Sequence, residues 1–114
     1  QKDNRDKCRV RNQNRRAKRF KLGGEVTLEE LNALMVAQDH KCANCKDELT
    51  DDNKHMDHIM PIILKGTGDI RNIQWLCDYC NFSKNDKHPD LWAKVVATKE
   101  WWDIKDLRQG KTDA

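Results

Sequence analysis

The sequence predicts a small α+β domain, and three observations support this. The chain has 114 residues, of which 37% are hydrophobic and 36% are charged. One thin core is all that such a chain can bury, and a core of this kind needs a staple. Four of the five cysteines form two CxxC pairs that can supply one. Segments with helical apolar spacing and short alternating segments both occur along the chain.

The paired cysteines are Cys42 with Cys45 and Cys77 with Cys80. A CxxC turn places two thiolates on one edge, and two such turns complete a tetrahedral sulfur shell around Zn²⁺. A thioredoxin-type redox site would need one CxxC inside a βαβ pattern, which is missing here. Disulfides are the other alternative, and nothing in the sequence marks the protein for export. We therefore predict a structural zinc ion, and we expect Cys8 to be an incidental free thiol.

The first 21 residues are strongly basic. They hold ten Lys and Arg side chains against Asp3 and Asp6, a net charge of +8, whereas the rest of the chain has twelve basic and seventeen acidic residues. This asymmetry predicts a nucleic-acid-binding arm at 1–21 attached to a domain at 22–114. A solvated tail without a partner is the alternative. The expected phosphate contacts are Arg9, Arg11, Arg15, Arg16, Lys18 and Arg19.

Local signals place the helices. Residues 5–20 can be helical, although no strong apolar stripe supports this. Thr27 and Glu30 form a capping-box pattern after two glycines, which predicts an amphipathic helix at 28–39. We expect a further helix after Cys80, and another that begins at Pro89.

Short strands are expected at about 54–59, ending at Asp57-His58, and at 73–76, where Ile73 and Trp75 alternate with Gln74 and Leu76. In the helix that begins at Pro89, the apolar residues Trp92, Val95 and Val96 share one face. Trp101 and Trp102 are expected to pack rather than to stack on bases.

The two CxxC pairs are unusually far apart. The 31 residues between Cys45 and Cys77 exceed the roughly 15 to 20 of ordinary zinc ribbons. The insertion contains Asp57-His58, a loop with Gly66 and Gly68, and Asn72-Ile-Gln-Trp-Leu leading into the second pair. We therefore expect it to have structure or function of its own.

Together these residues resemble a known family. The pattern Asp57-His58-Ile-x-Pro, a glycine-containing loop, and Asn72-Ile-Gln-x-Leu-Cys-x-x-Cys-Asn81-x-x-Lys84 is similar to the HNH endonucleases, whose fold is the ββα-metal motif. The resemblance covers about residues 22–88. It departs at Asn81, where His is common, so this is an HNN-type variant and the metal preference can differ. The arrangement of arm, zinc and core also resembles small bacteriophage nucleases.

The resemblance implies a nuclease site, and the side-chain chemistry agrees. A neutral imidazole accepts a proton at pH 7, so His58 is the candidate general base. Asp57 offers the hard oxygen that Mg²⁺ or Mn²⁺ prefers, and Asn81 adds a carbonyl oxygen. Neighbours on a strand point to opposite faces, so Asp57 and His58 can meet at one phosphate only where the strand ends or bends.

Other polar residues have candidate roles. The resemblance implies that Asn72 pins the loop between the strands through backbone hydrogen bonds. Lys84 is either a phosphate contact or a solvated lysine. His55 shares a strand face with Asp57 and is a candidate third metal ligand. We expect His40 and His88 to be surface or packing residues.

We therefore predict a metal-dependent DNA endonuclease with a structural zinc and a separate catalytic ion. The alternatives are an inactive zinc-stapled DNA-binding module and a zinc module for protein interaction, which would leave the basic arm without a purpose. No apolar run approaches the roughly 20 residues that span a bilayer. We expect a cytoplasmic protein of a bacterial or phage-infected cell, with a phage packaging or restriction assembly as the larger complex that the resemblance would imply.

Overall fold

The computed structural model describes residues 2–19 and 24–109, and within the first helix the side chains of residues 5–15. The order of elements is α1 (Lys2–Arg19), α2 (Leu28–Ala37), β1 (His55–His58), the 3-10 turns η1 (Ile62–Leu64) and η2 (Ile70–Asn72), β2 (Ile73–Leu76), α3 (Asp78–Lys84), α4 (Pro89–Val96) and α5 (Lys99–Arg108). The predicted α+β class is confirmed. No helix of the described ranges is long and apolar enough to cross a membrane.

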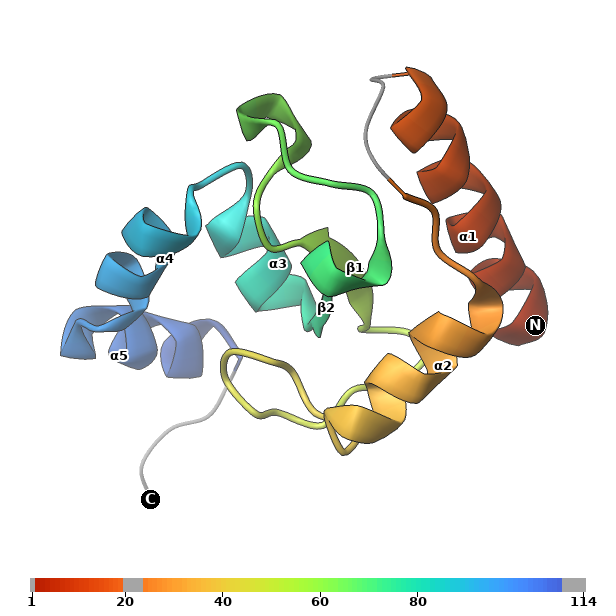
Figure 1. The fold of residues 1–114 in the computed structure, drawn as a ribbon. Coiled ribbons are helices and arrows are strands. Elements are labelled where there is room, and N and C mark those ends of the chain that lie inside the picture. The colour runs from red at the N-terminus through yellow and green to blue at the C-terminus, as the bar shows by residue number, and fades with distance from the viewer. Residues whose placement is uncertain (1, 20–23, 110–114) are drawn as a thin grey trace.

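A short hairpin and one helix form the centre of the molecule. Strands β1 and β2 pair antiparallel, with Asp57 opposite Gln74 and His58 opposite Ile73. Helix α3 packs against both strands. Helix α1 lies on one side of this ββα unit and helices α4 and α5 lie on the other (Figure 1). Strand β1 ends at His58. This agrees with the expectation that Asp57 and His58 can face one site only where the strand ends or bends.

Helix α2 begins as predicted. Thr27 caps it, since the Thr27 hydroxyl accepts from the Glu30 amide at 3.1 Å and the Glu30 carboxylate accepts from the Thr27 amide at 2.9 Å. The helix ends two residues earlier than expected because Asp39 and His40 have positive φ angles of 55° and 56°. Its buried Leu31 belongs to the core and accepts a hydrogen bond from the Trp75 indole at 3.1 Å through its carbonyl.

Helix α3 begins earlier than predicted. Cys77 has extended backbone angles and is the N-cap, so the helix starts at Asp78 rather than after Cys80. Cys80 and Asn81 therefore both lie on the first turns of the helix. Cys80, a predicted zinc ligand, and Asn81, a candidate site residue, are therefore held by the same rigid element.

Helices α4 and α5 pack through tryptophans, as expected. Trp101 is 8% exposed and its ring makes edge contacts with Tyr79, Trp92 and Trp102 at centroid distances of 5.5, 5.6 and 4.8 Å. Its indole N–H donates to Ser83 Oγ at 2.9 Å. Edge-to-face pairs of this kind add to the burial of large rings. The C-terminal helices are therefore joined to α3 and extend the core.

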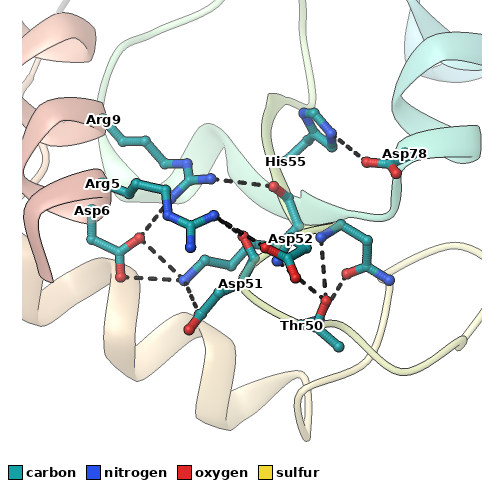
Figure 2. Close-up of polar contacts among 10 residues, drawn as sticks. Arg5, Asp6, Arg9, Thr50, Asp51, Asp52, His55 and Asp78 are labelled. Atoms are coloured by element: carbon teal, nitrogen blue, oxygen red, sulfur yellow. Dashed lines mark hydrogen bonds and ion pairs between the residues drawn. The ribbon is translucent and has the colours of Figure 1, made fainter. Parts of the chain in front are cut away.

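Helix α1 docks on the domain through charged side chains (Figure 2). Asp6 is 2% exposed and forms ion pairs with Arg9 at 2.7 Å and with Lys54 at 3.1 Å. Lys54, itself 5% exposed, also lies over the Trp75 ring at 5.0 Å. Gln13 is buried and donates to the Gly68 carbonyl at 3.2 Å. Because these docking contacts of α1 are made by polar groups, the sequence of the helix shows no apolar stripe that would have predicted them.

The predicted boundary at residue 21 falls among residues 20–23, which lie outside the described part of the chain. The division into a basic arm and a domain therefore stays a prediction. The described side chains show that the part of α1 from Arg5 to Arg15 contacts the domain at several points.

Breaking the buried pair should destabilise the fold. Asp6→Ala leaves Lys54 buried with only the partly exposed Asp51, and removing one partner of a buried ion pair costs about 3–5 kcal/mol. We expect a loss of about 3 kcal/mol in the free energy of unfolding by urea. The control is Asp52→Ala, whose carboxylate is 91% exposed and pairs with Arg5 at 3.4 Å, so it should cost less than about 1 kcal/mol. Equal losses would contradict this account of helix docking.

Candidate active site and metal centre

The four predicted zinc ligands lie together. The sulfur atoms of Cys42, Cys45, Cys77 and Cys80 are all within 4.8 Å of one another, and Cys45 and Cys77 are 3.7 Å apart. Tetrahedral Zn–S bonds of about 2.3 Å place sulfur atoms about 3.8 Å apart. The arrangement therefore fits a zinc ion, with two ligands from the first CxxC turn and two from the start of α3.

Backbone geometry shapes the first CxxC turn. Lys46 has a φ of 67°, and its amide donates to the Cys42 carbonyl at 3.1 Å. The Asp47 amide donates to Cys45 Sγ at 3.5 Å, and the Asn44 side-chain amide donates to Cys80 Sγ at 3.5 Å. N–H groups that point at sulfur favour the thiolate, the form in which cysteine binds zinc.

The sulfur cluster also has its own electrostatics. Hydrogen bonds with Cys45 and Cys77 lower the pKa of the Cys42 thiol. Hydrogen bonds with Cys42 and Cys45, together with burial, raise the pKa of the Cys80 thiol. Ionisation of Cys42 thus opposes ionisation of Cys80. Four thiolates at these distances need a cation among them, which agrees with a divalent metal ion.

A second constellation opens on a cleft of about 680 Å³. Asp57 and His58 reach it from the end of β1 and Asn81 reaches it from α3, whereas the far wall is formed by the loop of Pro61, Ile62 and Ile63. The three candidate residues come from two elements that the ββα packing brings together. The structure therefore brings the predicted core of the site to one place.

Asp57 is held at the bottom of this cleft. It is 7% exposed, and its Oδ2 accepts a hydrogen bond from Gln74 Nε2 at 2.9 Å and forms an ion pair with Lys84 Nζ at 3.2 Å. Burial raises the pKa of Asp57, while the contacts with Gln74 and Lys84 act in the opposite direction. The protein therefore fixes one oxygen of this carboxylate at the cleft.

Lys84 is buried rather than on the surface, and it is not among the residues that line the cleft. It is 1% exposed, and besides its ion pair with Asp57 it donates to the His58 carbonyl at 3.0 Å. The expectation of a solvated lysine is therefore wrong, because the ammonium is bonded within the protein. Its contacts with Asp57 and His58 mean that it fixes the end of β1.

Asn72 holds the loop as the resemblance implied. Its Oδ1 accepts from the Met60 amide at 2.8 Å, and its Nδ2 donates to the Met60 and Thr67 carbonyls, each at 2.9 Å. Gly66 makes the close approach possible, since a Cβ there would lie 1.8 Å from the Met60 carbonyl oxygen. Asn72 does not line the cleft.

The other histidines lie elsewhere. His55 Nε2 contacts Asp78 Oδ1 at 2.5 Å at the start of α3 (Figure 2) and is not among the residues that line the cleft. The structure therefore does not bring this candidate third ligand to Asp57 and Asn81. His40 is exposed, and His88 Nδ1 caps α4 by accepting from the Asp90 amide at 3.0 Å.

The basic residues of α1 differ in availability. Arg9 is bonded to Asp6 and to the Lys54 carbonyl and lies over Trp75 at 5.6 Å, so it serves helix docking instead of presenting a free guanidinium to phosphate. Arg11 and Arg15 are exposed. The side chains of Arg16, Lys18 and Arg19 lie outside the described ones.

Sequence reasoning missed three residues of the site. Asn85 and Asp86 line the cleft just beyond α3, and Gln74 orients Asp57. Gln74 had a usable signal, because pairing the two predicted strands in the observed register places it opposite Asp57. Asn85 and Asp86 had none, since their place depends on where α3 ends.

Residues 42–94 match the HNH endonuclease family. This segment is therefore similar to HNH domains over a little less than half of the chain. The CRISPR-associated endonuclease Cas9 of Corynebacterium diphtheriae is 38% identical over 58 residues, which is 50% of this chain and 5% of that protein. The crystal structure of the type II-C Cas9 enzyme from Actinomyces naeslundii has the same fold over 84% of this chain and 11% of its own, with a TM-score of 0.52 and 22% identity. The chain thus spans a small part of these relatives, and α1 and α5 lie outside the matched HNH segment.

The zinc site gives a direct test of the fold. Binding of zinc by four thiolates is largely folding energy, so Cys45→Ser or Cys77→Ser should abolish the cooperative unfolding transition and lower the zinc content well below one ion per chain. The control is Cys8→Ser, whose thiol is exposed and far in sequence from the cluster. Elemental analysis and thermal unfolding measure both effects. A folded wild-type protein without zinc would contradict the prediction.

Proposed function

We propose that this chain is a metal-dependent DNA endonuclease that hydrolyses phosphodiester bonds with His58 as general base. The observation that supports it is the convergence of Asp57, His58 and Asn81 on one cleft of an HNH domain. A domain that only bound DNA would have no need of a buried carboxylate, an imidazole and an amide facing the same space. Phosphodiester hydrolysis needs these groups, because water must be deprotonated and phosphate charge must be neutralised.

His58 takes the proton from the attacking water. Its position at the last residue of β1 is set by the Lys84 bond to its carbonyl, so the imidazole stands on a rigid backbone. Proton transfer to a positioned base contributes roughly 10²- to 10⁴-fold in rate. The cleft beside it is open enough to admit a phosphate of the DNA backbone.

Asp57 and Asn81 are the proposed ligands of Mg²⁺ or Mn²⁺, and other divalent ions are alternatives. A bound ion would act as a Lewis acid on the phosphate oxygens. Within the described residues, the four cysteines are the single group of three or more His, Cys, Asp or Glu ligands close enough to hold an ion. Of the residues that line the cleft, Asp57 and Asn81 are the proposed carboxylate and amide ligands, a donor set that suits Mg²⁺ completed by water and substrate phosphate.

Helix α1 supplies the proposed contact with the DNA backbone. Lys7, Arg11 and Arg15 are exposed on the helix, whereas Arg5 and Arg9 are engaged with Asp52 and Asp6. Lys and Arg contacts with phosphates give affinity without reading sequence. The docking of α1 makes these cations a fixed part of the domain surface.

Sequence preference, the assembly in which the protein acts and its cytoplasmic location stay predictions. The two relatives are endonucleases of which an HNH domain is a small part, so this chain can equally act within a larger complex. Phage packaging and restriction assemblies remain the candidates from the sequence pattern. An inactive DNA-binding module would bind duplex DNA without cleaving it in any divalent metal.

The general base is tested by His58→Ala. We expect plasmid cleavage in Mg²⁺ or Mn²⁺ to slow by about 10²- to 10⁴-fold under single-turnover conditions, while DNA affinity stays the same because it depends on cations. His40→Asn is the matched control, since His40 is exposed and Asn tolerates its positive φ. It should cleave at the wild-type rate.

Asp57→Ala separates the metal role from the base role in the same assay. Its defect should be relieved in part by a higher metal concentration, and that of His58→Ala should not. Wild-type cleavage by His58→Ala, with contaminating nuclease excluded, would show that the base is misassigned. Absence of cleavage by the wild-type protein in every metal would favour the binding module.

The basic face of α1 is tested by replacing Lys7, Arg11 and Arg15 with Gln, which keeps the docking residues intact. If about five cations contact phosphates, log affinity should fall with log salt at a slope near −4.5, and the triple variant should flatten the slope by up to about 2.7. Lys94→Gln with Lys99→Gln is the control on the far helices. An unchanged slope in the triple variant would show that α1 does not bind DNA.

A further inference from the structure

Lys105 is a buried lysine of α5, beyond the segment that matches the HNH family. It is 2% exposed, and its ammonium donates to Asp47 Oδ2 at 2.7 Å and to Gln109 Oε1 at 2.6 Å. Lysine is seldom fully buried, because desolvation of its charge costs free energy unless a partner offsets it. Nothing in the proposed cleavage reaction uses this residue.

Asp47 links Lys105 to the first CxxC turn. The Asp47 carbonyl accepts from the Cys42 amide at 2.8 Å, and the Asp47 amide donates to Cys45 Sγ at 3.5 Å. One residue thus contacts two zinc ligands through its backbone and Lys105 through its side chain. Burial acts to lower the pKa of Lys105, but the hydrogen bond and charge of the Asp47 carboxylate help to raise it overall, so the lysine is a cation beside the residue that contacts Cys42 and Cys45.

Aromatic packing holds α5 in this place. Trp101, four residues before Lys105, contacts Tyr79, which lies between the ligands Cys77 and Cys80. Residues four apart lie on the same face of a helix, so the face of α5 that packs on α3 through Trp101 also carries Lys105, which contacts Asp47. Helix α5 thus contacts the segment of the second CxxC pair through Trp101 and the residue after the first CxxC turn, Asp47, through Lys105.

The charge of Lys105 has the opposite sign to the net charge expected of a zinc-loaded four-cysteine site. Four thiolates and one Zn²⁺ carry a net charge of −2, and three of the four ligands are buried. Asp47 adds another negative charge, but its side chain is 29% exposed and partly hydrated, whereas the ammonium is enclosed. We propose that Lys105 is a positioning residue that offsets the negative charge of the four-cysteine site and so raises its affinity for Zn²⁺. This inference needs the zinc site and is independent of DNA cleavage.

The test compares two ways of breaking the Lys105–Asp47 pair in the full chain. Lys105→Met removes the cation, and zinc affinity should fall about 10- to 100-fold, as for other residues that support metal ligands. Asp47→Asn removes the anion instead and leaves Lys105 to face the sulfurs, so zinc should bind at least as tightly as in the wild type. A role in folding alone would make the two variants equally defective. Competition for Zn²⁺ with a chromogenic chelator at fixed pH measures the affinity.

Two controls complete the experiment. Lys105→Arg keeps the charge and should restore most of the affinity, and Lys99→Met removes an 83% exposed lysine of the same helix and should have no effect. If Lys105→Met does not fold, a loss of zinc affinity in Asp47→Asn beyond about tenfold overturns the proposal by itself. Equal losses in Lys105→Met and Asp47→Asn also overturn it. A wild-type chain that binds no Zn²⁺ would instead remove the zinc site.

Discussion

Four sulfur atoms join two segments that are 31 residues apart, and most of the structure depends on that junction. The first CxxC turn is also tied to β2, because the Ala43 amide donates to the Trp75 carbonyl at 3.0 Å. The second pair spans the start of α3. Because the chain has few apolar residues, these four cysteines are important for holding the sheet and α3 in a fixed relative position, which we call the corner. The corner sets how far Asn81 stands from the end of β1.

Elements with local signals were predictable. The two CxxC pairs, the capping box at Thr27 and the proline at position 89 each act within a few residues, so their effect is visible in the sequence. The start of α3 was misjudged because a cysteine that ligates zinc can also be an N-cap, and only the position of its backbone shows this. The cleft residues Asp57, His58 and Asn81 were found by a pattern that runs from Asp57 to Lys84.

Contacts between distant segments could not be predicted. The burial of Asp6, Lys54 and Lys105 depends on partners up to 58 residues away, and a charged residue gives no periodic sign that it will be buried. Lys84 was expected to face either phosphate or water for the same reason. Hydrophobic patterning predicts helix faces that pack on apolar surfaces. In this chain, ion pairs also attach several helices to the rest of the domain, and the pattern does not predict those contacts.

The loop between β1 and β2 combines a locked base with an open tip. Asn72 and Gly66 hold both ends of the loop against the Met60 peptide, where there is no room for another side chain. Between these ends, Ile63 and Leu64 are 74% and 45% exposed, and Ile63 borders the cleft. Substitution at the tip would change this wall of the cleft without moving the proposed catalytic groups. Residues at the tip of the loop can therefore vary while Gly66 and Asn72 keep its ends in place, which makes the tip well suited to diversification.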